Sequence, residues 1–186
     1  MIFKKLLRNY WLLFLIAGLV IILDQVSKAY IRANFIENVD RWAPWDWMLP
    51  YARIIHITNT GVAFGMFQGM NEVFAILATI VSLAIIYYYP RIPASDWILR
   101  IALGLQLAGA MGNLIDRVVY GNVTDFISVG TFAVFNVADA SISVGVAVLI
   151  LGVWIQEQNQ KKQAMQAQSS AAGADASAQD SHPGEI

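Results

Sequence analysis

Cysteine is absent from this sequence of 186 residues, and histidine occurs only twice, as His56 and His182. The lack of cysteine excludes disulfides, thiolate nucleophiles, cysteine zinc sites and a lipidated cysteine within the chain itself. The two histidines stand far apart and the second lies in a polar tail, which argues against a histidine triad or a multi-histidine metal site. Any chemistry therefore falls to carboxylates, and we expect no metal and no cofactor.

Charge is also scarce. Charged residues make up 13% of the chain, hydrophobic residues make up 58%, and the net charge is only -1. A nucleic-acid partner would call for a concentrated basic face, so the composition gives no support for one. A soluble helical protein would carry a polar stripe on each helix, whereas several runs here carry almost none. The composition therefore indicates an integral membrane protein.

Long apolar runs are abundant. About 20 mainly apolar helical residues cross the hydrocarbon core of a bilayer. Four segments meet this requirement, at about 10–31, 73–89, 97–116 and 138–155. Basic residues precede the first segment, and no small-residue cleavage site follows it, so we interpret it as a retained span with a cytoplasmic start. Four spans then predict that both termini are cytoplasmic.

The segments between the spans predict a small outer structure. The loops at about 32–72 and 117–137 lie on the periplasmic side in this topology. The stretch "RWAPWDWMLPY" is rich in tryptophan and suits the headgroup region. We expect "ARIIHITNTGVAFGMF" to form a short hairpin that turns at "NTG", and "VTDFISVGTFAVF" to turn at Gly130. These two stretches are predicted to pair in one small β-sheet.

The C-terminal part differs from the rest. Residues 157–186 are rich in Gln, Ala and Ser and lack a sustained apolar face. This composition predicts a disordered cytoplasmic tail. The predicted organisation is thus a membrane domain over residues 1–156, followed by the tail.

Polar residues gather at one face of the predicted membrane domain. With four spans, the first and third end outside and the fourth begins there. Their polar residues at that face are Asp24 and Lys28, then Asn113, Asp116 and Arg117, then Asn136 and Asp139. Within each span they are spaced to lie on one helix face, which should turn toward the bundle interior. Gly109, Gly112, Ala138 and Ala140 would let the helix backbones approach closely there.

Several of these residues have purely structural explanations. Asp24 and Lys28 form an i, i+4 pair that could simply stabilise a helix end, and Asp116 beside Arg117 has a similar explanation. Asn59 and Gly61 fit a turn, and Arg100 is expected to extend to the cytoplasmic interface.

Asp125 and Asp139 are different, because each lies among apolar residues with no opposite charge within four positions. Two carboxylates brought together in such a place share a proton, as in an aspartic protease.

Five short blocks carry a resemblance to a known family. They are "DQVSK" (24–28), "NTGVAF" (59–64), "GNLIDR" (112–117), "VTDF" (123–126) and "FNVADAS" (135–141). In order and spacing these blocks resemble the signature blocks of the bacterial lipoprotein signal peptidase, signal peptidase II. The resemblance covers residues 5–156.

The resemblance implies a four-helix aspartic endopeptidase of the bacterial inner membrane. Such an enzyme removes the signal peptide from prolipoproteins, just before a cysteine that carries a diacylglyceryl group. By motif, Asp125 and Asp139 would be catalytic, with an active site near the periplasmic face. The binding and supporting residues would be Asp24, Lys28, Asn59, Gly61, Asn113, Asp116, Arg117 and Asn136. The expected partners are the prolipoprotein and membrane lipids, and the chain is expected to act as a monomer.

Two other classes of function remain open at this point. A small proton-coupled transporter would also place ionisable residues in the membrane. The charges gather at one face, however, and only Gln106, Thr79 and Ser82 are polar along a path to the cytoplasm. A scaffold without activity would explain the outer loops but not the two unpaired aspartates.

Overall fold

The structure is a computed structural model that describes residues 2–61 and 66–179, with side chains for 9–61 and 66–166. It is mainly helical, with four helices long and apolar enough to cross a membrane. These candidate spans are Asn9–Asn34, Asn71–Arg91, Trp97–Tyr120 and Val137–Gln166. The helices that contain them are α1 (Ile2–Asn34), α2 (Asn71–Tyr88) with η3 (Tyr89–Arg91), α3 (Trp97–Tyr120) and α4 (Val137–Gln179). The prediction of four membrane helices is confirmed.

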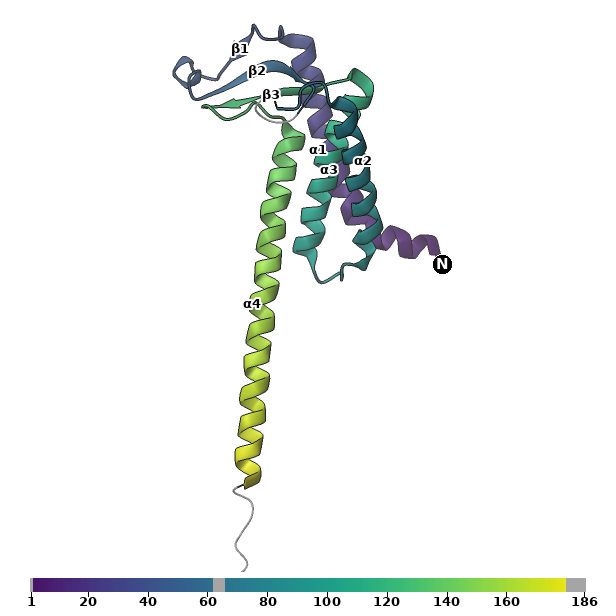
Figure 1. The fold of residues 1–186 in the computed structure, drawn as a ribbon, viewed down its shortest axis with the longest axis vertical. Helices are drawn as coiled ribbons and strands as arrows, with labels where there is room; N and C mark the ends of the chain where they lie inside the picture. The colour runs from purple at the N-terminus through teal and green to yellow at the C-terminus, as the bar shows by residue number, and fades with distance from the viewer. Residues whose placement is uncertain (1, 62–65, 180–186) are drawn as a thin grey trace, which may run out of the picture. The chain divides into compact units, whose positions relative to one another are not determined.

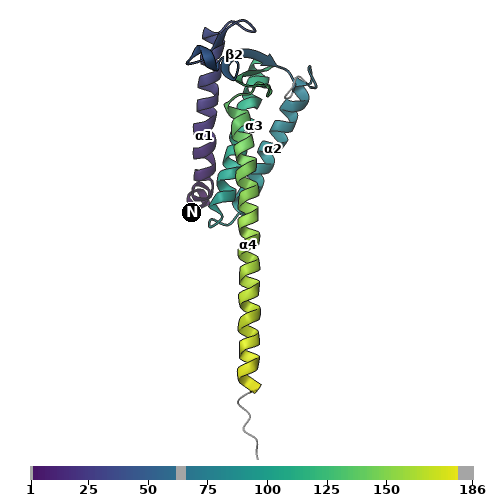
Figure 2. The same cartoon turned by 90° about the vertical axis from the view of Figure 1, so that its left-hand side faces the viewer.

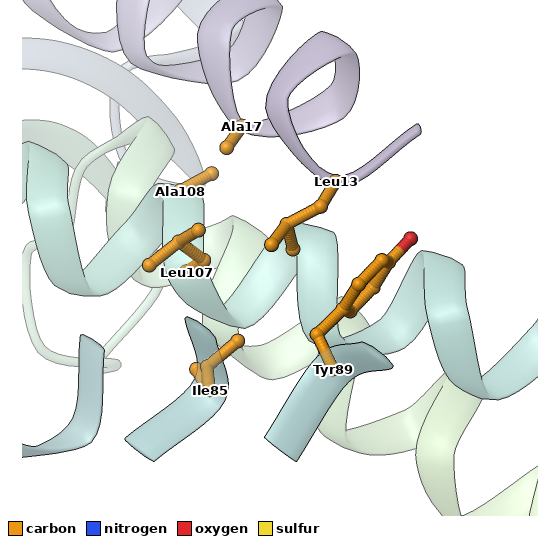
Figure 3. Close-up of a cluster of buried hydrophobic side chains, with 6 residues drawn as sticks. All are labelled: Leu13, Ala17, Ile85, Tyr89, Leu107 and Ala108. Atoms are coloured by element: carbon orange, nitrogen blue, oxygen red, sulfur yellow. The ribbon is translucent and has the colours of Figure 1, made fainter. Parts of the chain in front are cut away.

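Helices α1 and α2 both pack against α3, and the three helices lie side by side (Figures 1 and 2). Small and large apolar side chains from all three helices and η3 meet in a buried cluster (Figure 3). Its members are Leu13, Ala17, Ile85, Tyr89, Leu107 and Ala108. Large apolar side chains such as Leu19 and Ile80 are instead more than half exposed, as expected for a surface that faces lipid.

A three-stranded antiparallel sheet lies at one end of these helices (Figure 1). It has the order β1 (Arg41–Trp42), β2 (Ala52–Asn59), β3 (Val123–Val129). The predicted pairing of the two outer stretches is therefore confirmed, and Gly130, with a φ of 53°, turns the chain after β3. Only two residues separate the end of α3 from the start of β3, and the first of them, Gly121, ends the helix in the left-handed conformation.

The expected hairpin after "NTG" is not tested, because residues 62–65 of its second half lie outside the described residues. The partners of β2 are β1 and β3, which come from other parts of the chain. Strand β1 lies in the Trp-rich stretch, where no strand was predicted. Trp42, Trp45 and Trp47 of this stretch are all more than half exposed.

The structure differs from the prediction beyond the fourth span. We expected disorder from residue 157, but α4 continues as a helix to Gln179, and the chain divides into two units between Leu149 and Ile150. Gln, Ala, Lys and Met are good helix formers, and Lys161 pairs with Glu157 at 2.6 Å one turn away. Residues 180–186 of the predicted tail lie outside the described residues.

Arg100 also differs from its expectation. Its side chain is buried against other elements, with only 7% exposed. Its guanidinium donates hydrogen bonds to the backbone oxygens of Asn9 and Ile92 and to the Tyr89 hydroxyl. Arg100 therefore joins α1, η3 and α3 at the end of the helices opposite the sheet.

Candidate active site

All ten predicted site residues belong to one continuous network at the end of α1 and α3, the start of α4 and the adjoining sheet. Hydrogen bonds and ion pairs connect every member to at least one other. The structure therefore brings together residues that are up to 115 positions apart in the sequence, from Asp24 to Asp139. Two groups of carboxylates within this network have different partners.

The first group is an ion-paired set, which we call the charge cluster: Asp24, Lys28, Asp116 and Arg32. The side chains of Asp24, Lys28 and Asp116 are fully buried. Lys28 Nζ lies 2.9 Å from Asp24 Oδ2 and 3.2 Å from Asp116 Oδ2. Arg32 Nη1 is 3.6 Å from Asp116 Oδ1. Two carboxylates and two cations therefore balance one another inside the bundle.

The charge cluster also holds the ends of two other elements. Asp24 Oδ1 accepts a hydrogen bond of 2.8 Å from the backbone N–H of Ala138, in the first turn of α4. That N–H has no partner within its own helix, and the helix dipole favours a negative charge there. Asp116 Oδ2 accepts a hydrogen bond of 3.1 Å from the backbone N–H of Thr124 in β3. These two aspartates therefore position the segments that carry Asp139 and Asp125.

Glycines allow the close approach that this arrangement needs. A Cβ on Gly112 would lie 2.8 Å from Asp24 Oδ2 and 3.0 Å from the Cβ of Ala138. A Cβ on Gly109 would lie 2.4 Å from the backbone oxygen of Ala138. Both approaches are shorter than real Cβ contacts, so α1, α3 and α4 meet only because these positions lack side chains. The predicted close packing at Gly109, Gly112 and Ala138 is confirmed.

The second group is the aspartate pair, Asp125 in β3 and Asp139 in the first turn of α4. Asn136 connects its members: Asn136 Nδ2 donates to Asp125 Oδ1 at 2.7 Å, and the Asn136 backbone N–H donates to Asp139 Oδ2 at 3.2 Å. Asn113 Nδ2 donates to Asp139 Oδ1 at 2.7 Å, and Asn59 Nδ2 donates to Asp125 Oδ2 at 3.0 Å. The aspartate pair is thus held by amides.

No lysine or arginine nitrogen among the described side chains lies within 4.0 Å of either member of the aspartate pair. Lys28 reaches the pair only through Asn113, whose Oδ1 accepts its hydrogen bond at 3.0 Å. This contact turns the amide nitrogen of Asn113 toward Asp139. The pKa of Asp125 is raised to about 7, first by burial and then by the neighbouring charge of Asp139, while the hydrogen bonds from Asn59 and Asn136 act in the opposite direction.

A cavity of about 700 Å³ opens beside the aspartate pair. Both aspartates line it, together with Asn59, Asn113 and Arg117. Its walls are mostly apolar side chains from the turn after β3 and from α4: Phe132, Val134, Phe135, Ile142 and Val144. Asp24, Lys28 and Asp116 do not line it, so the charge cluster lies behind the aspartate pair.

Arg117 stands at the cavity as a cation without a carboxylate within 4.0 Å in the described part of the chain. Its Nη2 donates to the backbone oxygen of Gly61 at 3.2 Å, and its guanidinium lies 5.5 Å from the ring centroid of Phe74. Contrary to the structural explanation from sequence, Asp116 pairs with Lys28 and not with the adjacent Arg117. Arg117 therefore keeps donors available at the cavity.

Sequence reasoning missed three residues of the network. Gln25 Nε2 lies within 3.2 Å of oxygens of Asp24, Gly112 and Asp116, so it ties α1 to α3. Arg32 donates a hydrogen bond to Thr124, and both of these residues also contact Asp116. Arg32 could have been found, because it continues the four-residue spacing of Asp24 and Lys28. Thr124 had no such signal.

Comparison with known proteins places this arrangement in a family. Residues 16–155 match the family model described as signal peptidase (SPase) II. A lipoprotein signal peptidase of Moorella thermoacetica is 37% identical over 132 residues, which cover 69% of this chain and 83% of the relative. One from Syntrophomonas wolfei is 39% identical over 134 residues, which cover 72% of this chain and 85% of the relative.

Solved structures agree with the sequence comparison. A bacterial membrane enzyme determined at 2.3 Å resolution matches with a TM-score of 0.71 and 33% identity, over 79% of this chain and 90% of that one. A second bacterial membrane enzyme, at 1.9 Å, matches with a TM-score of 0.66 and 34% identity, over 76% and 91%. The chain therefore belongs to the signal peptidase II family of peptidases and is a multi-pass bacterial membrane protein, as its five sequence blocks predicted.

Proposed function

We propose that this chain is an aspartic endopeptidase that removes the signal peptide from diacylglyceryl-modified prolipoproteins, cutting just before the lipidated cysteine. The relatives are named lipoprotein signal peptidases, which supports a prolipoprotein substrate. The observation that carries the proposal is the aspartate pair, one buried and one half-buried carboxylate that share Asn136 and face one apolar cavity. Membership of a peptidase family leaves the transporter and scaffold alternatives without support.

The chemistry uses one proton shared by Asp125 and Asp139. One ionised carboxylate accepts a proton from a water molecule as the water oxygen attacks the scissile carbonyl carbon. The protonated partner donates a hydrogen bond to the carbonyl oxygen and stabilises the tetrahedral intermediate. A proton then passes to the amide nitrogen, the C–N bond breaks, and the pair returns to its singly protonated form. A pKa of about 7 at Asp125 fits a carboxyl that holds a proton near neutral pH.

The neighbouring amides and Arg117 would orient the reactants. Asn59, Asn113 and Asn136 each donate to a carboxylate of the pair, so both side chains are fixed before substrate binds. Arg117 lines the same cavity with free donors and would bind a backbone carbonyl of the signal peptide. The apolar walls suit the apolar residues that precede the cut and the adjoining lipid.

The proposed orientation places both termini in the cytoplasm of the cell and the aspartate pair near the periplasmic face of the inner membrane. The basic residues Lys4, Lys5 and Arg8 before the first span support a cytoplasmic start. The exposed tryptophans of the stretch 41–51 support a position of the sheet at the opposite interface. The substrate's cleavage point would then reach the aspartate pair from the bilayer, and one chain acting as a monomer contains every residue of the proposed site.

The test is incubation of the purified protein with two versions of one prolipoprotein peptide, with and without the diacylglyceryl group. We expect cleavage of the lipidated peptide only, between the residue before the cysteine and the cysteine itself, with mass spectrometry of both products as the measurement. Equal cleavage of both peptides would contradict the proposed substrate. A cut at another bond would contradict the proposed cleavage site.

A further inference from the structure

Arg32, in the last turn of α1, reaches a residue next to the aspartate pair. Its Nη1 donates to Thr124 Oγ1 at 3.0 Å and lies 3.6 Å from Asp116 Oδ1. Its guanidinium carbon lies 4.1 Å from the ring centroid of Tyr120, a cation–π distance. Only 21% of the Arg32 side chain is exposed. The guanidinium is therefore fixed in direction by the last turn of α3 on one side and by β3 on the other.

Thr124 is held by both its side chain and its backbone. The Arg32 guanidinium donates to the hydroxyl, and Asp116 Oδ2 accepts from the backbone N–H at 3.1 Å. Thr124 is 1% exposed and pairs with Thr58 of β2 in the sheet register. The two contacts come from α1 and α3, so the start of β3 is attached to both helices at one residue.

Thr124 and Asp125 are consecutive residues of one strand. Consecutive side chains of a strand point to opposite faces, which agrees with their contacts: Thr124 binds the charge cluster and Asp125 lines the cavity. A shift or rotation of the backbone at Thr124 would move the Asp125 carboxyl relative to Asn59 and Asn136, which donate to it at 3.0 and 2.7 Å.

We infer that Arg32 is a positioning residue that acts through the Thr124 hydroxyl to fix the direction of Asp125. This inference rests on the proposed function, in which Asp125 is a catalytic residue. Arg32 does not line the cavity, so it has no contact with the substrate there. Its expected effect is on the turnover of bound substrate and not on substrate affinity.

The alternative is a purely structural role, in which Arg32 only balances the charge of Asp116. Thr124→Val distinguishes the two roles, because it should lower kcat only if Arg32 acts through the Thr124 hydroxyl. This change keeps the volume and the backbone contact to Asp116 but removes the hydroxyl, so it leaves the charge balance intact. Thr124→Ser restores a hydroxyl and should restore the contact with Arg32.

The experiment measures kcat and KM for a lipidated peptide with Arg32→Gln, Thr124→Val and the double variant, each corrected for the folded fraction. We expect each single change to lower kcat by about tenfold with little change in KM, because small misplacements of catalytic groups are costly. The double variant should be no slower than the slower single variant, because both changes remove one contact. Thr124→Ser should retain most of the activity.

Arg91→Gln is the matched control. Arg91 also lies over a tyrosine ring, with 3.9 Å between its guanidinium carbon and the centroid of Tyr87, but it belongs to η3, at the end of the helices opposite the sheet. This variant should keep the wild-type kcat. If Arg32→Gln does not fold, Thr124→Val decides the question by itself.

Two outcomes separate this inference from the proposed function. An unchanged kcat in folded Thr124→Val, together with an inactive Asp125→Asn, would overturn the role of Arg32 and leave the aspartate pair in place. An active Asp125→Asn would overturn the pair as the catalytic group. A drop in melting temperature without a drop in kcat would show that Arg32 is only structural, and a rise in KM alone would also contradict positioning.

Discussion

The charge cluster and the aspartate pair each contain two aspartates at the same end of the molecule, yet their partners differ. Asp24 and Asp116 lie 2.9 and 3.2 Å from the ammonium of Lys28. Asp125 and Asp139 are bound by amides of asparagines and face the cavity. A cation beside a carboxylate favours its ionised form, whereas Asp125, with no lysine or arginine nitrogen within 4.0 Å among the described side chains, has a pKa raised to about 7 by burial. Under the proposed function, the partner of each carboxylate therefore separates the two structural aspartates from the two chemical ones.

The first prediction concerns the aspartate pair. Asp125→Asn and Asp139→Asn should each lower kcat for a lipidated peptide by about 10³-fold or more, because the general acid or base is removed. The protein should still insert and fold, since neither aspartate has a lysine or arginine nitrogen within 4.0 Å among the described side chains. The measurement is turnover in detergent with size-exclusion chromatography as the folding check. Asp46→Asn, on an exposed residue of the Trp-rich stretch, is the control and should remain fully active.

The second prediction concerns the charge cluster. Lys28→Met should lower the free energy of unfolding by about 3–5 kcal/mol, because it leaves Asp24 and Asp116 buried with one cation fewer. The yield of folded protein and its melting temperature are the measurements. Lys161→Met removes a lysine from an exposed pair with Glu157 and should leave both unchanged. A stable Lys28→Met would show that the cluster's charges are not needed for folding and would remove the contrast between the two groups.

The third prediction tests the close approach of the helices behind the aspartate pair. Gly112→Ala should destabilise the protein by about 1–3 kcal/mol, since the added methyl group would press on Asp24 and Ala138. Gly18→Ala in α1 is the matched control: its Cβ would meet nothing within 4 Å, and a change within about 1 kcal/mol is expected. Thermal unfolding of both variants is the measurement. Equal melting temperatures would mean that the helices can separate at Gly112 without cost.

The last prediction is a pH dependence of stability. The pKa of Asp125 is about 7 in the folded protein, against an ordinary value of 3.8. Between these values the folded state holds a proton that the unfolded state has released, so stability should fall as the pH rises from about 4 to 7. Asp125→Asn should remove this part of the decline, a difference of roughly 10 °C in melting temperature for a shift of about three pKa units. Asp46→Asn should keep the wild-type slope, and identical slopes for wild type and Asp125→Asn would contradict a raised pKa.

Much of the fold could be predicted from sequence because membrane spans depend on local composition. A run such as 10–31 needs only its own apolar residues to indicate a helix across the bilayer, and the observed span is Asn9–Asn34. The third helix was predicted to end at residue 116, four residues too early, since it continues to Tyr120 and ends only at Gly121. The helix after residue 157 was missed because polar composition was interpreted as disorder, whereas Gln, Ala and Lys also favour helices.

The site residues could be named from the sequence, since their spacing and motif blocks single them out, but their partners could not. Asp116 follows the helix spacing of Asn113, yet sequence gave it the adjacent Arg117 as partner, and in the structure it binds Lys28 from another helix. The link through Asn136 and the contact of Arg32 with Thr124 both depend on the end of α1, the start of β3 and the start of α4 meeting in space.

The sequence by itself determined the four apolar helices, the pairing of the two outer stretches and the ten residues that meet in one network, because each follows from composition, periodicity or motif within a short stretch. Only the tertiary structure decided which aspartates have a cation. The pairing of each aspartate depends on distances of a few ångströms between segments far apart in the chain. The glycines at positions 109 and 112 make this close approach possible. It leaves Asp24 and Asp116 paired with Lys28, and Asp125 and Asp139 held by amides beside the cavity.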